Sequence, residues 1–222
     1  MKSSNYYSQC GEDKFLWEKY FSSYSAPTSQ CYYYEMGAMD GVTYSNTKFF
    51  EDSCGWTGVL VEGNPLIFPR LLLNRPNNVL MNALCSDSKE PLNFNICCNV
   101  PAVCSVEMSK PIDFDQKYYN HSQMIKCRLI PVTLDSIFER ANVPRIDLCI
   151  IDVEGHEINV LKSCSFKLPV VMCLIEFLDD DVKNEEVKTI MASHGFSYIE
   201  RCAHNAVFIN DKFKHYFTSL SV

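Results

Sequence analysis

Short apolar runs recur along the chain, and between them lie segments whose composition suits helices. The runs at residues 146–151 and 170–175 have the length of a strand and are typical of central parallel strands covered on both faces. The pattern predicts strands over residues 31–37, 58–62, 78–82, 146–151, 170–175, 198–202 and 206–210, and helices over residues 46–52, 65–74, 133–141, 156–162 and 182–194. This alternation predicts an α/β fold with a doubly wound, mostly parallel sheet, closed by an antiparallel strand pair.

Two of the predicted helices carry local start signals. Pro65 suits the first position of a helix, because its missing N–H has no partner there anyway. The acidic run Asp179–Asp181 precedes the helix expected from Val182, where a carboxylate would cap the free N–H groups. The same run could instead bind a metal ion, but helix capping is the simpler interpretation.

The length of 222 residues favours a single domain over residues 1–222, with one interruption of the alternation. Residues 86–128 contain three prolines and four cysteines, and we interpret them as an insertion of short strands and loops that faces the substrate. Tyr118, Tyr119 and His121 within it are residue types that stack on and hydrogen-bond a sugar. The alternative is a surface hairpin without a role in binding.

Composition excludes several classes of partner. Lysine and arginine total 20 against 27 aspartates and glutamates, a net charge of −7, which argues against binding to a nucleic-acid backbone. No apolar run approaches the length that spans a bilayer, and the first twenty residues lack a secretory signal, so we expect a cytoplasmic protein without a membrane partner. The twelve cysteines lack zinc-site spacing and are expected to be reduced and structural.

Polar residues follow the predicted strands at their carboxyl ends. Ligands of open α/β sheets bind at this edge, and buried strands do not need carboxylates there for stability. The residues concerned are Glu35, Glu62, Asn82, Asp152 and Glu176. Their repeated placement is the first functional signal in the sequence.

The loop after the first strand indicates the cofactor. It departs from the dinucleotide pattern G-x-G-x-x-G. Gly37 occupies the first glycine position of that pattern, but Met39 and Val42 occupy the second and third glycine positions. Its carboxylates, Glu35 and Asp40, repel phosphate but attract an ammonium or sulfonium group. A cofactor that is cationic at this point and carries no phosphate is S-adenosylmethionine.

Two further strand ends fit the same cofactor. Glu62 lies 21 residues after Gly41, a spacing at which an acidic residue accepts hydrogen bonds from ribose hydroxyls. The alternative is a solvated strand end. Asn82 and Ala83 could contact adenine through an amide and the backbone, although a plain turn would look the same.

Asp152, Glu154 and His156 follow the strand at 146–151 and are candidate catalytic residues, together with Glu176 after the next strand. An alcohol is a poor nucleophile at neutral pH, so methyl transfer to a hydroxyl needs a base or a metal. Either His156 or a carboxylate is the base, or Asp152 and Glu176, with or without Glu154, hold Mg²⁺ or Mn²⁺. The alternative is that Asp152 only orients the cofactor and His156 lies at a helix N-terminus.

Five motifs in the same order resemble the FkbM family of methyltransferases over residues 8–162. They are SQCGED at 8–13, EMGAMDGVTYSNT at 35–47, GWTGVLVEGNP at 55–65, NRP at 74–76 and IDVEGHE at 151–157. The resemblance implies a class I, Rossmann-like O-methyltransferase that uses S-adenosylmethionine. Members methylate hydroxyls of sugars, glycans and polyketide rings. The resemblance also implies that the protein is fused to, or associates with, glycosyltransferases. Gly63 replaces the proline that many members have, and residues 86–128 resemble no family.

The resemblance also assigns site residues. Gly37, Ala38 and Gly41 would line the methionine part of the cofactor, and Glu62 would hold the ribose. Residues implied to lie nearby or to close over the cofactor are Asp40, Asn46, Thr47, Gln9 and Asp13. For Gln9 and Asp13 the alternative is an N-terminal helix that docks on the sheet.

The sequence therefore predicts an O-methyltransferase acting on a carbohydrate, such as a glycan or a deoxyhexose like rhamnose, by in-line displacement. Two alternatives stay open: an O-methyltransferase of another small molecule, and a catalytically inactive adapter that keeps the fold. The set of carboxylates at the strand ends argues against the adapter. The missing glycines argue against an NAD oxidoreductase.

Overall fold

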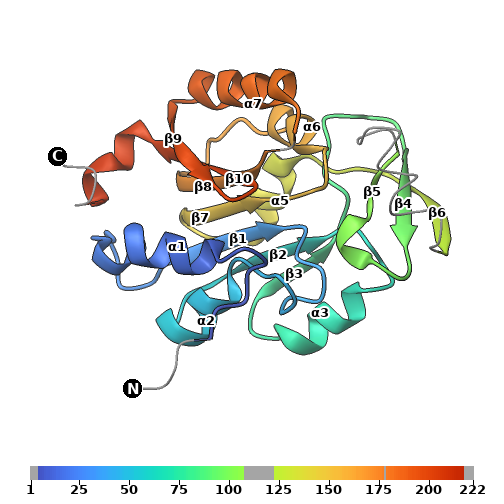
Figure 1. Ribbon diagram of the computed structural model, residues 1–222, viewed down its shortest axis with the longest axis horizontal. Coiled ribbons are helices and arrows are strands. Elements are labelled where there is room, and N and C mark those ends of the chain that lie inside the picture. Colours follow the sequence, from blue (N-terminus) through green and yellow to red (C-terminus); the bar gives the residue numbers. More distant parts are fainter. Residues whose placement is uncertain (1–4, 108–122, 178, 218–222) are drawn as a thin grey trace.

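The computed structural model describes residues 5–107, 123–177 and 179–217, and its main feature is a seven-stranded sheet (Figure 1). The strand order is β3-β2-β1-β7-β8-β10-β9, with parallel pairing from β3 through β8 and antiparallel pairing of β10 with β8 and β9. The bounds are β1 Tyr32–Met36, β2 Thr57–Glu62, β3 Val79–Asn82, β7 Ile146–Ile151, β8 Val170–Glu176, β9 Phe196–Cys202 and β10 Asn205–Asn210. The predicted doubly wound sheet with a closing antiparallel pair is confirmed.

Helices cover both faces of this sheet (Figure 1). One face packs on α1 Glu12–Lys19, α2 Lys48–Cys54 and α3 Phe68–Asn74, and the other packs on α5 Leu134–Ala141, α6 Glu157–Lys162 and α7 Asp181–Ser193. Alternate residues of β1 divide between the two cores, with Tyr33 on the first face and Tyr34 on the second. Three 3₁₀ turns complete the described elements, at Phe21–Ser23, Pro101–Val103 and Asp211–Tyr216.

Two helices begin later than the sequence predicts. The helix expected from Pro65 begins at Phe68, because the Asn64 side chain accepts a hydrogen bond from the Leu66 N–H at 2.9 Å and holds a turn there. The helix expected from Asn46 begins at Lys48, because the Asn46 N–H donates to Glu35 instead. The predicted cap of α7 is confirmed, since Asp180 accepts from the N–H groups of Val182 and Lys183 at 3.1 Å.

The predicted insertion contains a second, three-stranded antiparallel sheet at one end of the molecule (Figure 1). Its order is β5-β4-β6, from β4 Leu92–Cys97, β5 Ser105–Val106 and β6 Met124–Leu129. It encloses a small apolar core of its own, centred on Leu84, Phe94, Ile96 and Val106. Tyr118, Tyr119 and His121 lie outside the described residues, so their substrate role stays a prediction.

Across the described ranges, no helix combines the length and the apolar character needed to cross a membrane.

Candidate functional site

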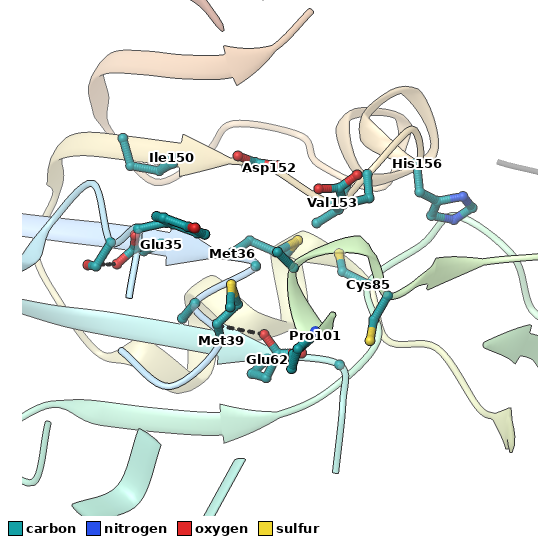
Figure 2. A pocket seen from close by; sticks show the side chains of 18 of the residues that line it. Glu35, Met36, Met39, Glu62, Cys85, Pro101, Ile150, Asp152, Val153 and His156 are labelled. Carbon is teal, nitrogen blue, oxygen red and sulfur yellow. Dashed lines mark hydrogen bonds between the residues drawn. The ribbon is translucent and has the colours of Figure 1, made fainter. Parts of the chain in front are cut away.

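A cavity of about 900 Å³, its open mouth included, lies at the carboxyl ends of the parallel strands (Figure 2). Its walls come from the loops after β1, β2 and β7, from the segment after β3 and from the insertion. Ten residues predicted for the site line it: Gln9, Glu35, Gly37, Ala38, Asn46, Glu62, Ala83, Asp152, Glu154 and His156. The cavity therefore lies at the strand ends where the sequence predicts a ligand, and what it binds stays a prediction.

The turn at Gly37 brings the end of β1 against the end of β7. Gly37 has φ +84°, and a Cβ built on it would lie 1.9 Å from the Asp152 carbonyl oxygen. Glycine is required here for close approach as well as for backbone conformation.

Replacing Gly37 by alanine should lower the free energy of unfolding by about 3 kcal/mol, because left-handed strain and a backbone clash add. Gly195→Ala is the matched control, since Gly195 has φ +80° but no heavy atom within 4 Å of its added Cβ. The control should lose only about 1–2 kcal/mol. Urea unfolding of both variants measures the difference, and equal losses would show that the contact with Asp152 does not matter.

Glu35 is directed into the protein and holds the loop that follows. Its buried carboxylate accepts from the Asn46 N–H at 2.7 Å, from Ser45 Oγ at 2.8 Å and from Thr47 Oγ1. Burial raises the pKa of Glu35, and the nearby Arg75 guanidinium opposes that rise. The sequence predicts that this carboxylate attracts the cationic group of the cofactor. In the structure its hydrogen bonds go to residues 45–47, so it also holds that loop in place.

Arg75 completes this network and was not predicted as a site residue. Its side chain is fully buried and donates to the Gly41 carbonyl, the Tyr33 hydroxyl and the Glu51 carboxylate. The arginine of the NRP motif was the only signal in the sequence. A buried arginine with several acceptors fixes the backbone of the loops around the cavity.

Glu62 lies on the cavity wall at the end of β2 (Figure 2). Its carboxylate accepts from the Met39 N–H at 2.7 Å and from the Asn64 N–H at 2.6 Å. Burial raises the pKa of Glu62 to about 6, against the opposing effect of these backbone donors. The neighbouring Cys104 thiol stays neutral, because burial raises its pKa to about 12.

Four residues predicted to bind the cofactor lie beside the cavity and are not among its lining residues in the described chain. Asp40 closes its own turn by accepting from the N–H groups of Val42 and Thr43. A Cβ on Gly41 would meet Arg75 and Leu71 at 2.6 Å, so this glycine serves packing. The other two are Thr47, which bonds to Glu35, and Asn82, which donates to the Glu62 carbonyl at 2.7 Å. Their direct contact with a cofactor stays a prediction without support from the geometry.

The predicted carboxylates after β7 and β8 do come together. Oxygen atoms of Asp152, Glu154 and Glu176 lie within 4.8 Å of one another, and all three side chains are half-buried. The register places Ile151 beside Ile175, so Asp152 and Glu176 follow at adjacent strand ends. Glu154 has φ +60°, an uncommon conformation for a glutamate, and forms a turn with Gly155. A second, polar cavity opens at this cluster and shares Gln9, Tyr44 and Asn46 with the first.

His156 lies at the other end of the cavity and points away from Asp152 in Figure 2. Its Nε2 is 3.0 Å from Ser86 Oγ. Burial lowers the pKa of His156 to about 4, with a smaller lowering effect from Lys183 and an opposing effect from Asp87. His156 therefore lies apart from the carboxylates after β7 and β8, and its role as the base stays a prediction.

The chain matches the family model described as the methyltransferase FkbM domain over residues 35–198, which is most of its length. The chain belongs to the FkbM methyltransferase family. A search of curated proteins found no match. The family and the fold agree on the class of enzyme, a methyltransferase with a Rossmann-like sheet.

Several cavity residues of this FkbM domain were not predicted. Phe94, Pro101, Ala102, Cys104 and Val106 reach it from the insertion and give one end of the cavity an apolar wall. The only signal for them was that residues 86–128 interrupted the alternation. The polar cavity is lined in addition by Tyr44, Glu12, His204 and Asn205; His204 lies in the turn between β9 and β10, and Asn205 begins β10.

Proposed function

We propose that the protein transfers a methyl group from S-adenosylmethionine to a hydroxyl of a carbohydrate, such as a glycan or a deoxyhexose like rhamnose. The observation that carries the proposal is a cavity with Glu62 at its apolar end and Asp152 and Glu154 at the other end, where the polar cavity adds Glu176. An acidic residue at the end of the second strand suits a ribose, and the apolar insertion wall suits adenine.

Methyl transfer requires that the cofactor be bound and that the acceptor hydroxyl lose its proton, and residues of this chain can do both. Bound S-adenosylmethionine supplies an activated methyl group on a sulfonium. Glu62 accepts hydrogen bonds from vicinal hydroxyls, and the Gly37 turn permits close backbone approach. Asp152 and Glu154 line the same cavity, and we assign the acceptor oxygen to a position beside them, where a carboxylate can accept the hydroxyl proton as the new O–C bond forms. The base role is therefore proposed for this pair.

A carbohydrate acceptor suits the polar cavity. Its lining of carboxylates, amides and Tyr44 offers acceptors and donors for several hydroxyl groups at once. Another hydroxyl-bearing small molecule is the alternative acceptor. A cytoplasmic location and an association with glycosyltransferases remain predictions from the sequence and the family resemblance.

Calorimetric titration of S-adenosylmethionine, and separately of NAD⁺, into the purified chain tests the cofactor. We expect saturable binding of S-adenosylmethionine alone. Binding of neither compound would favour the inactive adapter.

Incubation with a panel of rhamnosides and other sugars, followed by mass spectrometry for one added methyl group, then tests the acceptor. Methylation of only non-sugar alcohols would contradict the carbohydrate assignment.

Cofactor affinity should depend on pH through Glu62. The carboxyl must be ionised to accept two hydrogen bonds from ribose, and its pKa in the free protein is about 6. As the pH falls from 7.5 to 5, the affinity for S-adenosylmethionine should fall about tenfold, because the free carboxyl takes up a proton that the complex excludes. Isothermal titration at several pH values measures this fall.

Glu62→Gln is the control for this pH dependence. It should bind the cofactor about ten- to a hundredfold more weakly at pH 7.5, because a charge-assisted pair of hydrogen bonds is lost. Its affinity should also become flat between pH 7.5 and 5. An unchanged pH profile in the variant would assign the titration to another group, such as Glu35, whose pKa is also raised.

A further inference from the structure

We propose that the polar cavity is a site for a divalent cation such as Mg²⁺ or Mn²⁺, held by Asp152, Glu154 and Glu176 together with the side-chain oxygens of Asn46 and Asn205. The assignment of the cation to activation of the acceptor hydroxyl rests on the proposed methyltransferase function. The existence of the binding site does not.

The three carboxylates have the spacing of a coordination sphere. Their nearest oxygens lie within 4.8 Å of one another. Oxygens on opposite sides of a bound cation are about 4.2 Å apart for Mg²⁺ and about 4.6–5.2 Å apart for Ca²⁺, so small side-chain adjustments suffice. Two neighbouring parallel strands, β7 and β8, position Asp152 and Glu176, and the left-handed turn at Glu154 brings the third carboxylate back to them.

Two buried amide oxygens point independently to a ligand in the same cavity. Asn46 is 7% exposed and Asn205 is 4% exposed, and both line the polar cavity. Within the described chain, neither Oδ1 atom has a hydrogen-bond partner. Buried polar atoms are normally satisfied, so these two oxygens indicate a missing partner that is electropositive.

The orientation of Asn205 is set by a neighbour outside the carboxylate cluster. Its Nδ2 donates to Glu12 Oε1 at 3.4 Å, which leaves the oxygen as the free end of the amide. The other Glu12 oxygen accepts from the Cys10 N–H at 2.9 Å, so Glu12 is itself held in place. Amide and carboxylate oxygens together are the ligand set that hard divalent cations prefer.

The charge balance favours a divalent cation over an ammonium group. Four carboxylates line the polar cavity, and no lysine or arginine is among its lining residues in the described chain. An ammonium from the cofactor or a substrate would compensate only one of these charges. A divalent cation compensates two and accepts oxygen ligands from several directions at once.

The location suggests what such a cation would do. The polar cavity shares Asp152 and Glu154 with the main cavity, so a sugar hydroxyl could be the next oxygen ligand. Coordination lowers the pKa of that hydroxyl. With Asp152 and Glu154 as ligands in place of the base, the proton would leave to water, the oxygen would form its bond to the methyl carbon, and the sulfur would keep the electron pair of the broken S–CH₃ bond.

Mn²⁺ binding to the metal-depleted full chain, followed by electron paramagnetic resonance, tests the site directly. We expect one class of saturable site, and we expect Glu176→Gln to weaken it by more than about tenfold. Glu186→Gln is the matched control, because Glu186 lies on the exposed side of α7 in an ion pair with Lys162 and should leave Mn²⁺ affinity unchanged. Thermal unfolding without metal establishes that both variants are folded.

Asn205→Ala provides a second, uncharged test. It removes the buried oxygen without changing the charge of the cavity, so weaker Mn²⁺ binding would identify coordination and not bulk electrostatic attraction. Equal Mn²⁺ affinity in wild type, Glu176→Gln and Asn205→Ala would overturn the proposal.

Cofactor titration in EDTA separates this proposal from the proposed function. If S-adenosylmethionine binds but Mn²⁺ does not, the cation site is wrong and the methyltransferase proposal stands. A loss of cofactor affinity in Glu176→Gln under EDTA would then assign the carboxylates to the cofactor's ammonium group. If Mn²⁺ binds but S-adenosylmethionine does not, the site stands and the proposed function fails. Turnover that EDTA abolishes and Mn²⁺ restores would support both.

Discussion

Replacing Arg75 by methionine should lower the free energy of unfolding by about 3–5 kcal/mol, because breaking a buried ion pair leaves its partners unpaired. The guanidinium is fully buried, and it donates to Glu51 and lies 4.0 Å from Glu35. Without it, only the hydrogen bonds from residues 45–47 would oppose the effect of burial on Glu35, and the pKa of this carboxyl would rise further. The loss of stability should therefore be larger at pH 8 than at pH 5, where Glu35 can take up a proton.

Urea unfolding at both pH values measures this effect. Arg70→Met is the matched control, because Arg70 is an exposed residue of α3, the helix that Arg75 directly follows, and should change stability by less than about 0.5 kcal/mol. Arg75→Lys keeps the charge but not the set of donors to Gly41 and Tyr33, so it should fall between wild type and Arg75→Met. A methionine variant as stable as the control would show that the network around Glu35 contributes nothing net.

The strand-end carboxylates could be predicted from the sequence because parallel strands bring their carboxyl ends to one edge. Asp152 and Glu176 follow apolar runs, which the sequence shows. The register of β7 and β8 then makes these two residues neighbours. The same rule could not separate Glu35 from Glu62, since both follow strands. Only the structure shows that both line the cavity, and that the loop at 45–47 holds the Glu35 carboxylate whereas backbone N–H groups of residues 39 and 64 hold that of Glu62.

The roles that were missed depend on contacts between segments far apart in the chain. Arg75 reaches Gly41 from α3, and Asn205 reaches Glu12 across most of the sequence. No local pattern marks such pairs. The late start of α3 has a related cause, because the Asn64 side chain accepts from the Leu66 N–H and holds a turn ahead of the helix.

His156 shows how burial changes a prediction based on residue type. In the sequence it is a candidate base, since an unperturbed imidazole titrates near pH 6.5. In the structure burial lowers its pKa to about 4, so protonation opposes folding. Stability from this group is complete above pH 6.5 and is lost as the pH falls toward 4. Burial depends on the insertion and on α6 packing together, which the sequence pattern did not specify.

Asp152→Asn should reduce methyl transfer by about a thousandfold while the protein stays folded and binds S-adenosylmethionine. The substitution keeps the shape of the side chain and removes the charge that aligns the acceptor, either directly as a base or through a bound cation. The backbone contacts of this residue, from its N–H to the Met36 carbonyl at 3.2 Å and from its carbonyl to Gly37, do not involve the carboxylate and are retained. Single-turnover formation of S-adenosylhomocysteine with an acceptor found by product screening measures the loss.

The pattern across variants identifies how the carboxylate acts. Asp87→Asn is the control, because Asp87 is an exposed carboxylate near His156 that does not line the cavity, and turnover should be unchanged. If Asp152 is a base, raising the pH should not rescue Asp152→Asn, and Glu176→Gln should be far less impaired. If both residues hold a cation, the two variants should be impaired alike, and high Mn²⁺ should partly restore each of them by mass action. Full activity of Asp152→Asn would move the chemistry away from the ends of β7 and β8 altogether.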